Sequence, residues 1–487
     1  MKTSTNFVAT LLSALAFAFV GSAHAQLFLP STGADREMGA QVAQQVEKRI
    51  GLLPAPALQD YVRVVGRRLV NEASDDRFQF SFDLVDQLEP NAFAAPGGYI
   101  FVSRGLLALL NSEDELADVL AHEIIHVTRR HSAKQERRGF LPGLLSVPGH
   151  VVGRVVDEDI GRLINAPASV LGGVTIASHS RAQEREADDR GLKLAAATGY
   201  DPSALATILT RMEKTIALVV PESTQRKPSF FDTHPTTSSR ARDIERVASG
   251  LRRSSRPPVT TNREDFLRRL DGLVLGENPA HGVFDGVRFI HPHLQFTLRF
   301  PADWKLVNTP RAVAAIKRDG NAAMILGIAG QGEDPEPPAR AFLEKLRESR
   351  LHPTRAERAQ AGAWPAFVVS VSDTTDRSRS EMHFVWAAHE GRIYQLIGLG
   401  TPEDVQVIRT SALTLREATP AELSAVTVRR LRLAAAQPGE SLEALSGRVG
   451  NVWSADLAAL VNDLPRQAPL VGGRLLKIAK SEPYVAR

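Results

Sequence analysis

The sequence predicts a multidomain α+β protein: a mainly helical domain with a small sheet, then an α+β module, then a small β-α-α-β domain. A length of 487 residues suggests about three domains. A capped amphipathic helix pattern begins at Ser112 and carries chemically distinctive side chains. A Ser-, Arg- and Pro-rich stretch at residues 249–262 is typical of an extended linker, and it places the first internal boundary near residue 250.

The N-terminal residues predict export. Lys2 precedes an apolar run over residues 7–20, and residues 23–25 (Ala-His-Ala) form a small-residue cleavage site. We therefore expect a secretory signal peptide over residues 1–25, cleaved after Ala25, and a periplasmic location. The apolar run is too short for a comfortable transmembrane span.

The composition excludes several classes of function. The chain has no cysteine, so it has no disulfide, no thiolate metal site and no lipid anchor on a cysteine after the signal peptide. The 59 basic and 55 acidic side chains leave a net charge of +4, which gives no reason to expect nucleic acid as a partner. Polar residues, Pro and Gly interrupt the apolar stretch 160–177. We expect it to form a buried hairpin or a lid near the active site, with membrane-surface contact as the alternative.

The segment His122-Glu123-Ile124-Ile125-His126 is the most informative part of the chain. Residues four apart lie on one face of a helix, so both imidazoles can reach one metal ion. Glu123 is placed to take a proton from water at that metal. The apolar face of the same helix is separate and consists of Leu116, Leu120, Ile124 and Val127. We therefore predict one Zn²⁺ ion per chain, held by His122 and His126, with Glu123 as the general base.

A zinc hydrolase also needs a third protein ligand and an open fourth position. The helical pattern over residues 180–188 places Glu184 and Asp188 on one face, four residues apart, and Glu186 on nearly the opposite side. We assign Glu184 as the third ligand and Asp188 as the residue that orients a ligand histidine. The alternative is a solvated, charged helix with no role at the metal.

These motifs resemble those of the HtpX-like zinc metallopeptidases, which are gluzincins. Their relatives include the CAAX prenyl proteases and the periplasmic protease type that oversees outer-membrane β-barrel assembly. The similarity covers residues 35–250. Beyond the two segments above, it is carried by Glu37-Met38-Gly39, Tyr61-Val62, Val65-Gly66, Leu69, residues 91–98, Arg130-His131, His234-Pro235 and Arg240. The resemblance implies the ligand role of Glu184, and it implies that His234 and Arg240 face the metal.

Two further histidines have alternative interpretations. His131 falls about 180° from His122 on an uninterrupted helix, so we expect a hydrogen-bonded structural histidine rather than a ligand. His234 precedes a proline in a polar loop, a position usually found at the surface. By the resemblance it either steadies the oxyanion beside Arg240 or fills the open zinc position and keeps the enzyme latent. The sequence does not choose between these roles.

Residues 91–107 contain the expected substrate platform. A Pro-Gly-Gly turn signal at 96–98 precedes a short β-prone run at 99–102. In zinc peptidases of this kind an edge strand pairs with the substrate backbone. The residues we expect to contact substrate are Asn91, Gly98, Tyr99, Ile100 and Phe101. The alternative is an ordinary core strand.

The second half of the chain predicts two further units. After a linker and short helix over residues 251–280, residues 281–424 alternate β-prone runs with an amphipathic helix, which predicts an antiparallel α+β module without a catalytic constellation. This module resembles the small α/β folds related to PsbP. Residues 425–487 follow a β-α-α-β order and resemble a LysM domain, a module associated with peptidoglycan. The alternative is a docking domain without affinity for glycan.

The sequence thus favours a periplasmic zinc endopeptidase that acts on unfolded or misassembled envelope proteins. Its expected partners include the outer-membrane assembly machinery and peptidoglycan. Two alternatives belong to other classes of protein. One is a chaperone that binds clients with little cleavage, and the other is an envelope protein tethered to peptidoglycan by its C-terminal domain.

Overall fold

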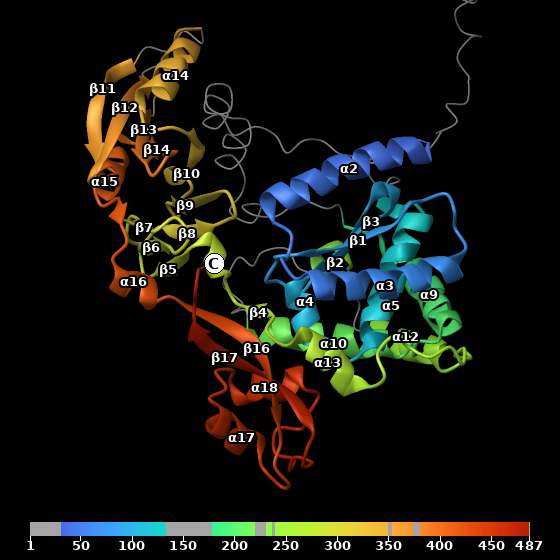
Figure 1. Cartoon of the computed structure of the whole chain (residues 1–487). Coiled ribbons are helices and arrows are strands. Elements are labelled where there is room, and N and C mark those ends of the chain that lie inside the picture. The colour runs from blue at the N-terminus through green and yellow to red at the C-terminus, as the bar shows by residue number, and fades with distance from the viewer. Residues whose placement is uncertain are drawn as a thin grey trace, which may run out of the picture.

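The computed structural model describes residues 31–132, 178–219, 230–235, 239–348, 353–373 and 380–486. The signal peptide predicted at 1–25 and the lid predicted at 160–177 lie outside these residues. The architecture is a mixture of helices and several sheets, as the sequence predicts, and it is described below in three parts along the chain (Figure 1). Among the described helices, none combines the length and the apolar character needed to cross a bilayer.

The first part is mainly helical and surrounds a small sheet. Its sheet has the strand order β1-β3-β2, with β3 parallel to β1 and antiparallel to β2. The elements are α2 (Thr32–Arg49), α3 (Pro56–Ala73), β1 (Ser81–Val85), β2 (Ala92–Ala95), η1 (Pro96–Gly98), β3 (Tyr99–Ser103), α4 (Arg104–Leu109), α5 (Glu113–Thr128), α9 (Arg181–Thr198), α10 (Ala204–Val219), α11 (Phe230–Thr233), α12 (Arg240–Ala248) and α13 (Arg263–Leu270).

Strand alternation explains how the helices cover this sheet. Phe101 packs with Val46 of α2, whereas Ile100 and Val102 belong to the cluster that contains the buried residues of α3 and α5. Successive side chains of a strand point to opposite faces, so α2 covers one face and α3 with α5 covers the other (Figure 1). The helix α5 is buried along almost its whole length, because the sheet, α3, α9 and α10 all pack around it.

The second part contains two sheets. A seven-stranded antiparallel sheet has the order β11-β12-β13-β14-β10-β9-β8, and a four-stranded sheet has the order β15-β7-β6-β5. The helix α14 packs on one face of the larger sheet, and α15 with the smaller sheet covers the other. The elements are η2 (Pro279–His281), β5 (Val283–Asp285), β6 (Arg288–His291), β7 (Phe296–Arg299), β8 (Lys305–Asn308), β9 (Ala312–Ile316), β10 (Ala323–Gln331), α14 (Glu336–Glu348), β11 (Pro353–Ala361), β12 (Trp364–Asp373), β13 (Ser380–His389), β14 (Arg392–Gly400), α15 (Pro402–Ala412), β15 (Arg416–Glu417) and α16 (Pro420–Ser424).

The third part is short and packs against the first. Its elements are β16 (Thr427–Ala435), α17 (Leu442–Val449), α18 (Ala455–Val461) and β17 (Leu475–Pro483), and the two strands pair antiparallel. The linker strand β4 (Val274–Leu275) extends this sheet by pairing with β16. Leu431, Val461 and Ala479 belong to the hydrophobic core of the first part. Most of the buried apolar side chains of the third part, among them Leu445, Ala458 and Leu476, form a separate core within the segment.

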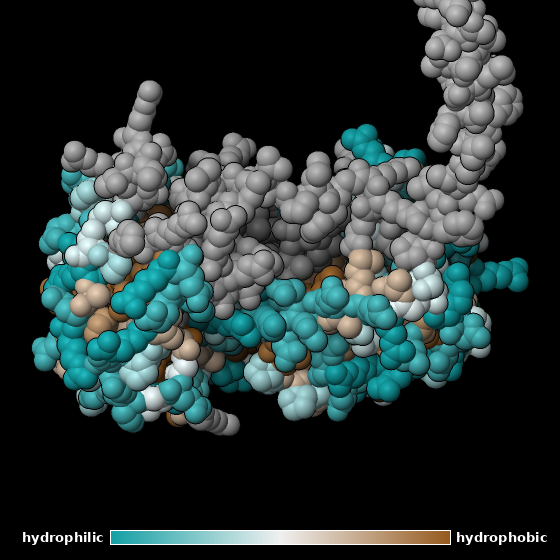
Figure 2. Space-filling view, turned by 90° about the horizontal axis from the view of Figure 1, so that it is seen from above, coloured by the Kyte–Doolittle hydropathy of each residue, from teal (hydrophilic) through white to brown (hydrophobic). Residues whose placement is uncertain are grey.

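The surface seen from above is mostly hydrophilic over the described residues. Apolar side chains appear there as small, separate patches (Figure 2). Scattered apolar residues are normal on a protein surface. The face shown thus gives no reason to expect a broad apolar docking surface among the described residues.

Candidate active site

The helix α5 brings the two predicted histidine ligands together. Ser112 caps its N-terminus and accepts a hydrogen bond from Glu115 N. His122 and His126 lie one turn apart and are almost completely buried, with 3.0 Å between their Nε2 atoms. The i, i+4 spacing therefore produces the geometry predicted from the sequence.

The helix α9 supplies the predicted third ligand. A capping box formed by Ser180 and Gln183 starts this helix and places Glu184 in its first turn. Glu184 Oε1 lies 3.4 Å from His126 Nε2, and Oε2 lies 3.6 Å from His122 Nε2. A Cβ at Gly191 would lie 3.1 Å from His122 N, so a glycine lets α9 approach α5 closely.

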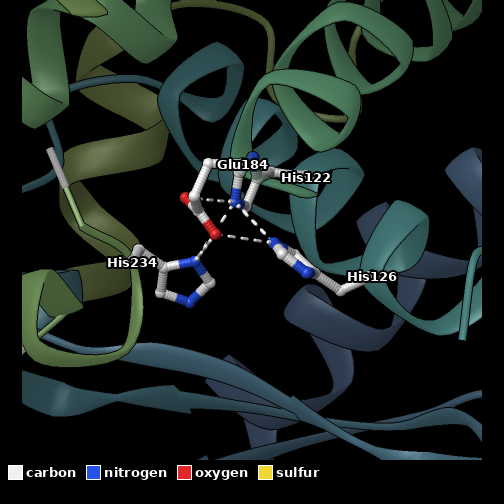
Figure 3. Close-up of side chains that lie close together, drawn as sticks. All are labelled: His122, His126, Glu184 and His234. Atoms are coloured by element: carbon white, nitrogen blue, oxygen red, sulfur yellow. Dashed lines mark hydrogen bonds and ion pairs between the residues drawn. The ribbon is translucent and has the colours of Figure 1, made fainter. Parts of the chain in front are cut away.

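These residues fit a metal ion. Figure 3 shows His122, His126, Glu184 and His234 pointing toward one another, and one potential ligand atom from each lies within 4.8 Å of the others. Both buried histidines turn Nε2 toward the shared space, and two facing nitrogen lone pairs are stable together when a cation lies between them. Burial holds the pKa of His126 well below its usual value, so this ring is neutral, as a ligand must be. Two imidazoles and a carboxylate form a typical zinc donor set.

Glu123, the general base predicted from the sequence, lies in the same buried cluster. Its side chain is fully buried, and neither carboxylate oxygen has a hydrogen-bond partner among the described residues. Burial raises the pKa of Glu123 above its ordinary value. A raised pKa makes a carboxylate a better proton acceptor, which suits acid–base catalysis near neutral pH.

Asp188 and Arg240 lie behind the ligands. Asp188 Oδ1 lies 3.0 Å from His122 Nδ1, as expected for a residue that orients this ring. Arg240 donates two hydrogen bonds to Asp188, of 2.9 and 2.8 Å, and its Nη1 lies 3.0 Å from Glu184 Oε2. His122 and Arg240 lower the pKa of Asp188 against the effect of burial. The guanidinium of Arg240 thus engages two carboxylates.

His234 is buried at the centre of the site rather than exposed in a loop. Its Nδ1 lies 3.3 Å from His122 Nε2 and 3.1 Å from Glu184 Oε1, and its Nε2 lies 3.4 Å from Glu123 Oε1. The ring of Phe230 stacks on it at a centroid distance of 4.2 Å. Burial lowers the pKa of His234, but the two carboxylates more than compensate, so its pKa lies above the usual value.

Sequence reasoning missed two features of this site. The ring of His179 stacks on that of His126 at 3.8 Å, and burial lowers the pKa of His179 to about 2. Its position directly before the cap of α9 was the signal that could have identified it. His131, expected on the opposite side of the helix, instead has its Nδ1 3.0 Å from His126 Nδ1. The expectation was wrong because α5 ends at Thr128, before His131 is reached.

The predicted substrate strand requires a correction. Tyr99, Ile100 and Phe101 belong to β3, which is the central strand of its sheet and pairs on both sides. Gly98 is buried, and a Cβ there would lie 2.4 Å from Gln79 O. These four residues therefore do not form a free edge. The edge strand of this sheet that packs against α5 is β2, and Asn91 directly precedes it.

Comparisons with known proteins agree with this site. A model of peptidase family M48 matches residues 56–248. The Beta-barrel assembly-enhancing protease of Escherichia coli (strain K12) is 31% identical over 279 residues, which cover 54% of this chain and 55% of that protein. Mitochondrial metalloendopeptidase OMA1 of Schizosaccharomyces pombe is 33% identical over 187 residues, 38% of this chain and 51% of that protein. The chain thus spans about half the length of these relatives.

A comparison with solved structures adds little. Cyanobacterial PsbP from Synechocystis sp. PCC 6803 matches 29% of this chain and 98% of that structure, at 9% sequence identity and a TM-score of 0.23. This TM-score is too low to support the resemblance predicted for residues 281–424.

Proposed function

We propose that residues 56–248, a domain of peptidase family M48, make this chain a zinc-dependent endopeptidase. The observation that carries the proposal is the arrangement around Glu123. A buried carboxylate without hydrogen-bond partners stands beside two inward-turned imidazoles and the Glu184 carboxylate. Burying a carboxylate without hydrogen bonds is unfavourable, so a purely structural role does not explain Glu123, whose contact with His234 at 3.4 Å is an ion pair.

In the proposed mechanism, His122, His126 and Glu184 hold the zinc ion. Zinc in such a site lowers the pKa of water toward neutrality and polarises the scissile carbonyl. Glu123 accepts the proton of the attacking water and then donates it to the nitrogen of the leaving amine. Asp188 fixes the orientation of the His122 ring.

We assign Arg240 a positioning role instead of the predicted contact with the oxyanion. Its guanidinium is occupied by Asp188 and Glu184, which it holds against the ligand cluster. His234 lies within the ligand set, at hydrogen-bond distance from Glu184. Of its two predicted roles, this position favours the latch: with zinc bound, His234 would serve as a fourth ligand and would have to leave before substrate enters.

We propose β2 as the strand that binds substrate, in place of β3. Asn91 O accepts a hydrogen bond from Ser103 N, so alternation turns the backbone groups of Ala92 and Ala94 away from β3. Ala94 O accepts a hydrogen bond of 3.3 Å from Ser132 Oγ, a contact that the substrate must displace. An extended substrate segment that pairs with this edge is held through its main chain, whatever its side chains are. Only an unfolded or locally unfolded protein offers such a segment.

The compartment and the partners are inferred from the sequence and from the relatives. The predicted signal peptide at 1–25 supports a periplasmic location. The name of the Escherichia coli relative links that protein to β-barrel assembly. We therefore propose unfolded or misassembled envelope proteins as substrates and the outer-membrane assembly machinery as a partner. Peptidoglycan binding by residues 425–487 stays a prediction, to be tested on the full chain because this segment shares a core with the first part.

The test is cleavage of an unfolded model protein by the zinc-loaded chain and by a Glu123→Gln variant. We expect the variant to bind zinc normally and to lose at least about 100-fold in kcat, because it has no proton acceptor. Equal cleavage by both forms would reject Glu123 as the base. If both forms carry zinc and neither cuts, even with His234 changed, the chaperone alternative replaces the protease.

A further inference from the structure

The chain reverses direction directly after the metal-binding helix. The helix α5 ends at Thr128, and Arg130 has φ of 57°, in the left-handed region that non-glycine residues rarely adopt. Arg130 donates hydrogen bonds of 2.7 and 2.9 Å to the carboxylate of Asp35, a buried residue of α2. This ion pair holds the reversal in place. Its consequence is that His131 turns back toward His126.

His131 connects a metal ligand to a carboxylate near the surface. Its side chain is buried, with Nδ1 3.0 Å from His126 Nδ1 and Nε2 3.3 Å from Glu186 Oε2. Two arginines hold Glu186: Arg129 Nε lies 2.6 Å and Arg190 Nε 3.1 Å from Glu186 Oε1.

Metal binding by His126 would determine which ring nitrogen carries the proton in both His126 and His131. If Nε2 of His126 faces the metal, its neutral ring carries its proton on Nδ1. That N–H donates to His131 Nδ1, so the proton of His131 is on Nε2. The Nε2–H of His131 then donates to Glu186. The N–H group of His126 thus meets His131, and the N–H group of His131 meets Glu186. No other placement of these two protons satisfies both contacts.

We propose that His131 is a positioning residue for zinc binding, and that it acts through His126 with Glu186 as the final acceptor. The proposal rests on the zinc site proposed above. The two histidine ligands are then oriented in different ways, since His122 faces the carboxylate of Asp188 directly and His126 reaches a carboxylate through an intervening imidazole. An acceptor behind a ligand histidine fixes its ring and makes it a stronger ligand.

The test measures the zinc dissociation constant of the full chain by competition with a chromophoric chelator. We expect His131→Leu, which removes the acceptor, to weaken zinc binding by about 10- to 100-fold. His131→Asn places an amide oxygen near the former Nδ1, and should bind zinc within about threefold of the original chain because an acceptor is retained. Glu186→Met should weaken binding by an intermediate factor.

Asp189→Met provides the matched control, because Asp189 lies on α9 near Glu186 and forms an ion pair with Lys193. It should leave zinc affinity unchanged. Melting of each zinc-free variant shows whether it folds, and Glu186→Met changes a partly exposed side chain, so it keeps the test valid if His131→Leu does not fold. The proposal is overturned if His131→Asn loses as much affinity as His131→Leu, or if Glu186→Met matches the control. Zinc affinity is measured without proteolysis, so a failure of the proposed protease activity would be seen separately.

Discussion

At the scale of single residues, a substitution of His234 distinguishes the proposed latch from a contact with the oxyanion. The imidazole of His234 contacts Glu184 through one nitrogen and lies 3.4 Å from the base Glu123 through the other. We predict that His234→Ala raises the rate of cleavage of an unfolded protein several-fold, because it empties the fourth position. The rate should be measured at saturating zinc.

If His234 instead stabilises the oxyanion, His234→Ala should lower the rate of cleavage. Loss of one oxyanion donor lowers kcat by about 10²- to 10³-fold, so a fall of that size would reject the latch. A Glu123→Gln/His234→Ala double variant is the control. It should show no cleavage, because any gain in rate must come from this site.

At the scale of elements, the close contact between α2 and the turn η1 supports the reversal that positions His131. A Cβ at Gly39 would lie 1.9 Å from Pro96 O and 2.7 Å from Tyr99 Cδ2. We predict that Gly39→Ala lowers the free energy of unfolding by about 1–3 kcal/mol, because α2 must move away from the sheet. The midpoint of urea unfolding measures the change.

A glycine-to-alanine substitution at another position of α2, Gly33, should not destabilise the protein. Gly33 has only Ser31 Oγ nearby, at 3.5 Å from an added Cβ. Gly33→Ala should therefore be neutral or stabilise the protein by up to about 1 kcal/mol through helix propensity. Equal destabilisation by both variants would show that the contact at Pro96 is not the cause.

The elements also show what the sequence could and could not predict. The spacing of His122, Glu123 and His126 was sufficient to predict that the two imidazoles lie side by side, because the geometry of one helical turn is local. Helix periodicity placed Glu184 and Asp188 on one face, but the resemblance to a known family was needed to expect Glu184 beside the histidines, because the packing of α9 on α5 is a long-range contact. His131 was misplaced because the left-handed Arg130 depends on an ion pair with Asp35, 95 residues away. The free edge was assigned to β3 instead of β2 because strand order depends on pairing between distant segments.

At the scale of the whole molecule, the C-terminal segment is joined to the metal-binding helix by buried polar groups. Lys477 Nζ donates to the carbonyls of Ala108, Leu109 and Leu110 at the end of α4, at 2.9, 3.1 and 2.8 Å. Those carbonyls have no further helical turn to bond, and a cation there is also favoured by the helix dipole.

A second contact reaches α5 itself. Arg211 of α10 donates two hydrogen bonds of 2.8 Å to Glu115 in the first turn of α5, and its Nε donates to Asp463 at 2.9 Å. The LysM-like segment is thus held to the first part through both its core and its charges. We therefore expect the stability of residues 427–483 to be coupled to that of α5, which carries the proposed zinc ligands His122 and His126.

We predict that Lys477→Met lowers the free energy of unfolding by about 2–4 kcal/mol, because the buried carbonyls of Ala108 and Leu110 lose their lysine donor, whereas Leu109 O still accepts from Arg211. Lys480→Met, at an exposed position of the same strand, should change the free energy of unfolding by less than about 0.5 kcal/mol.

Hydrogen exchange tests whether the C-terminal segment and α5 unfold together. If the parts unfold together, Lys477→Met increases exchange in α5 as well as in β16 and β17, since residues that open as one unit lose protection together. Faster exchange confined to residues 427–483 would instead show an independent domain, and peptidoglycan binding could then be tested on that segment alone.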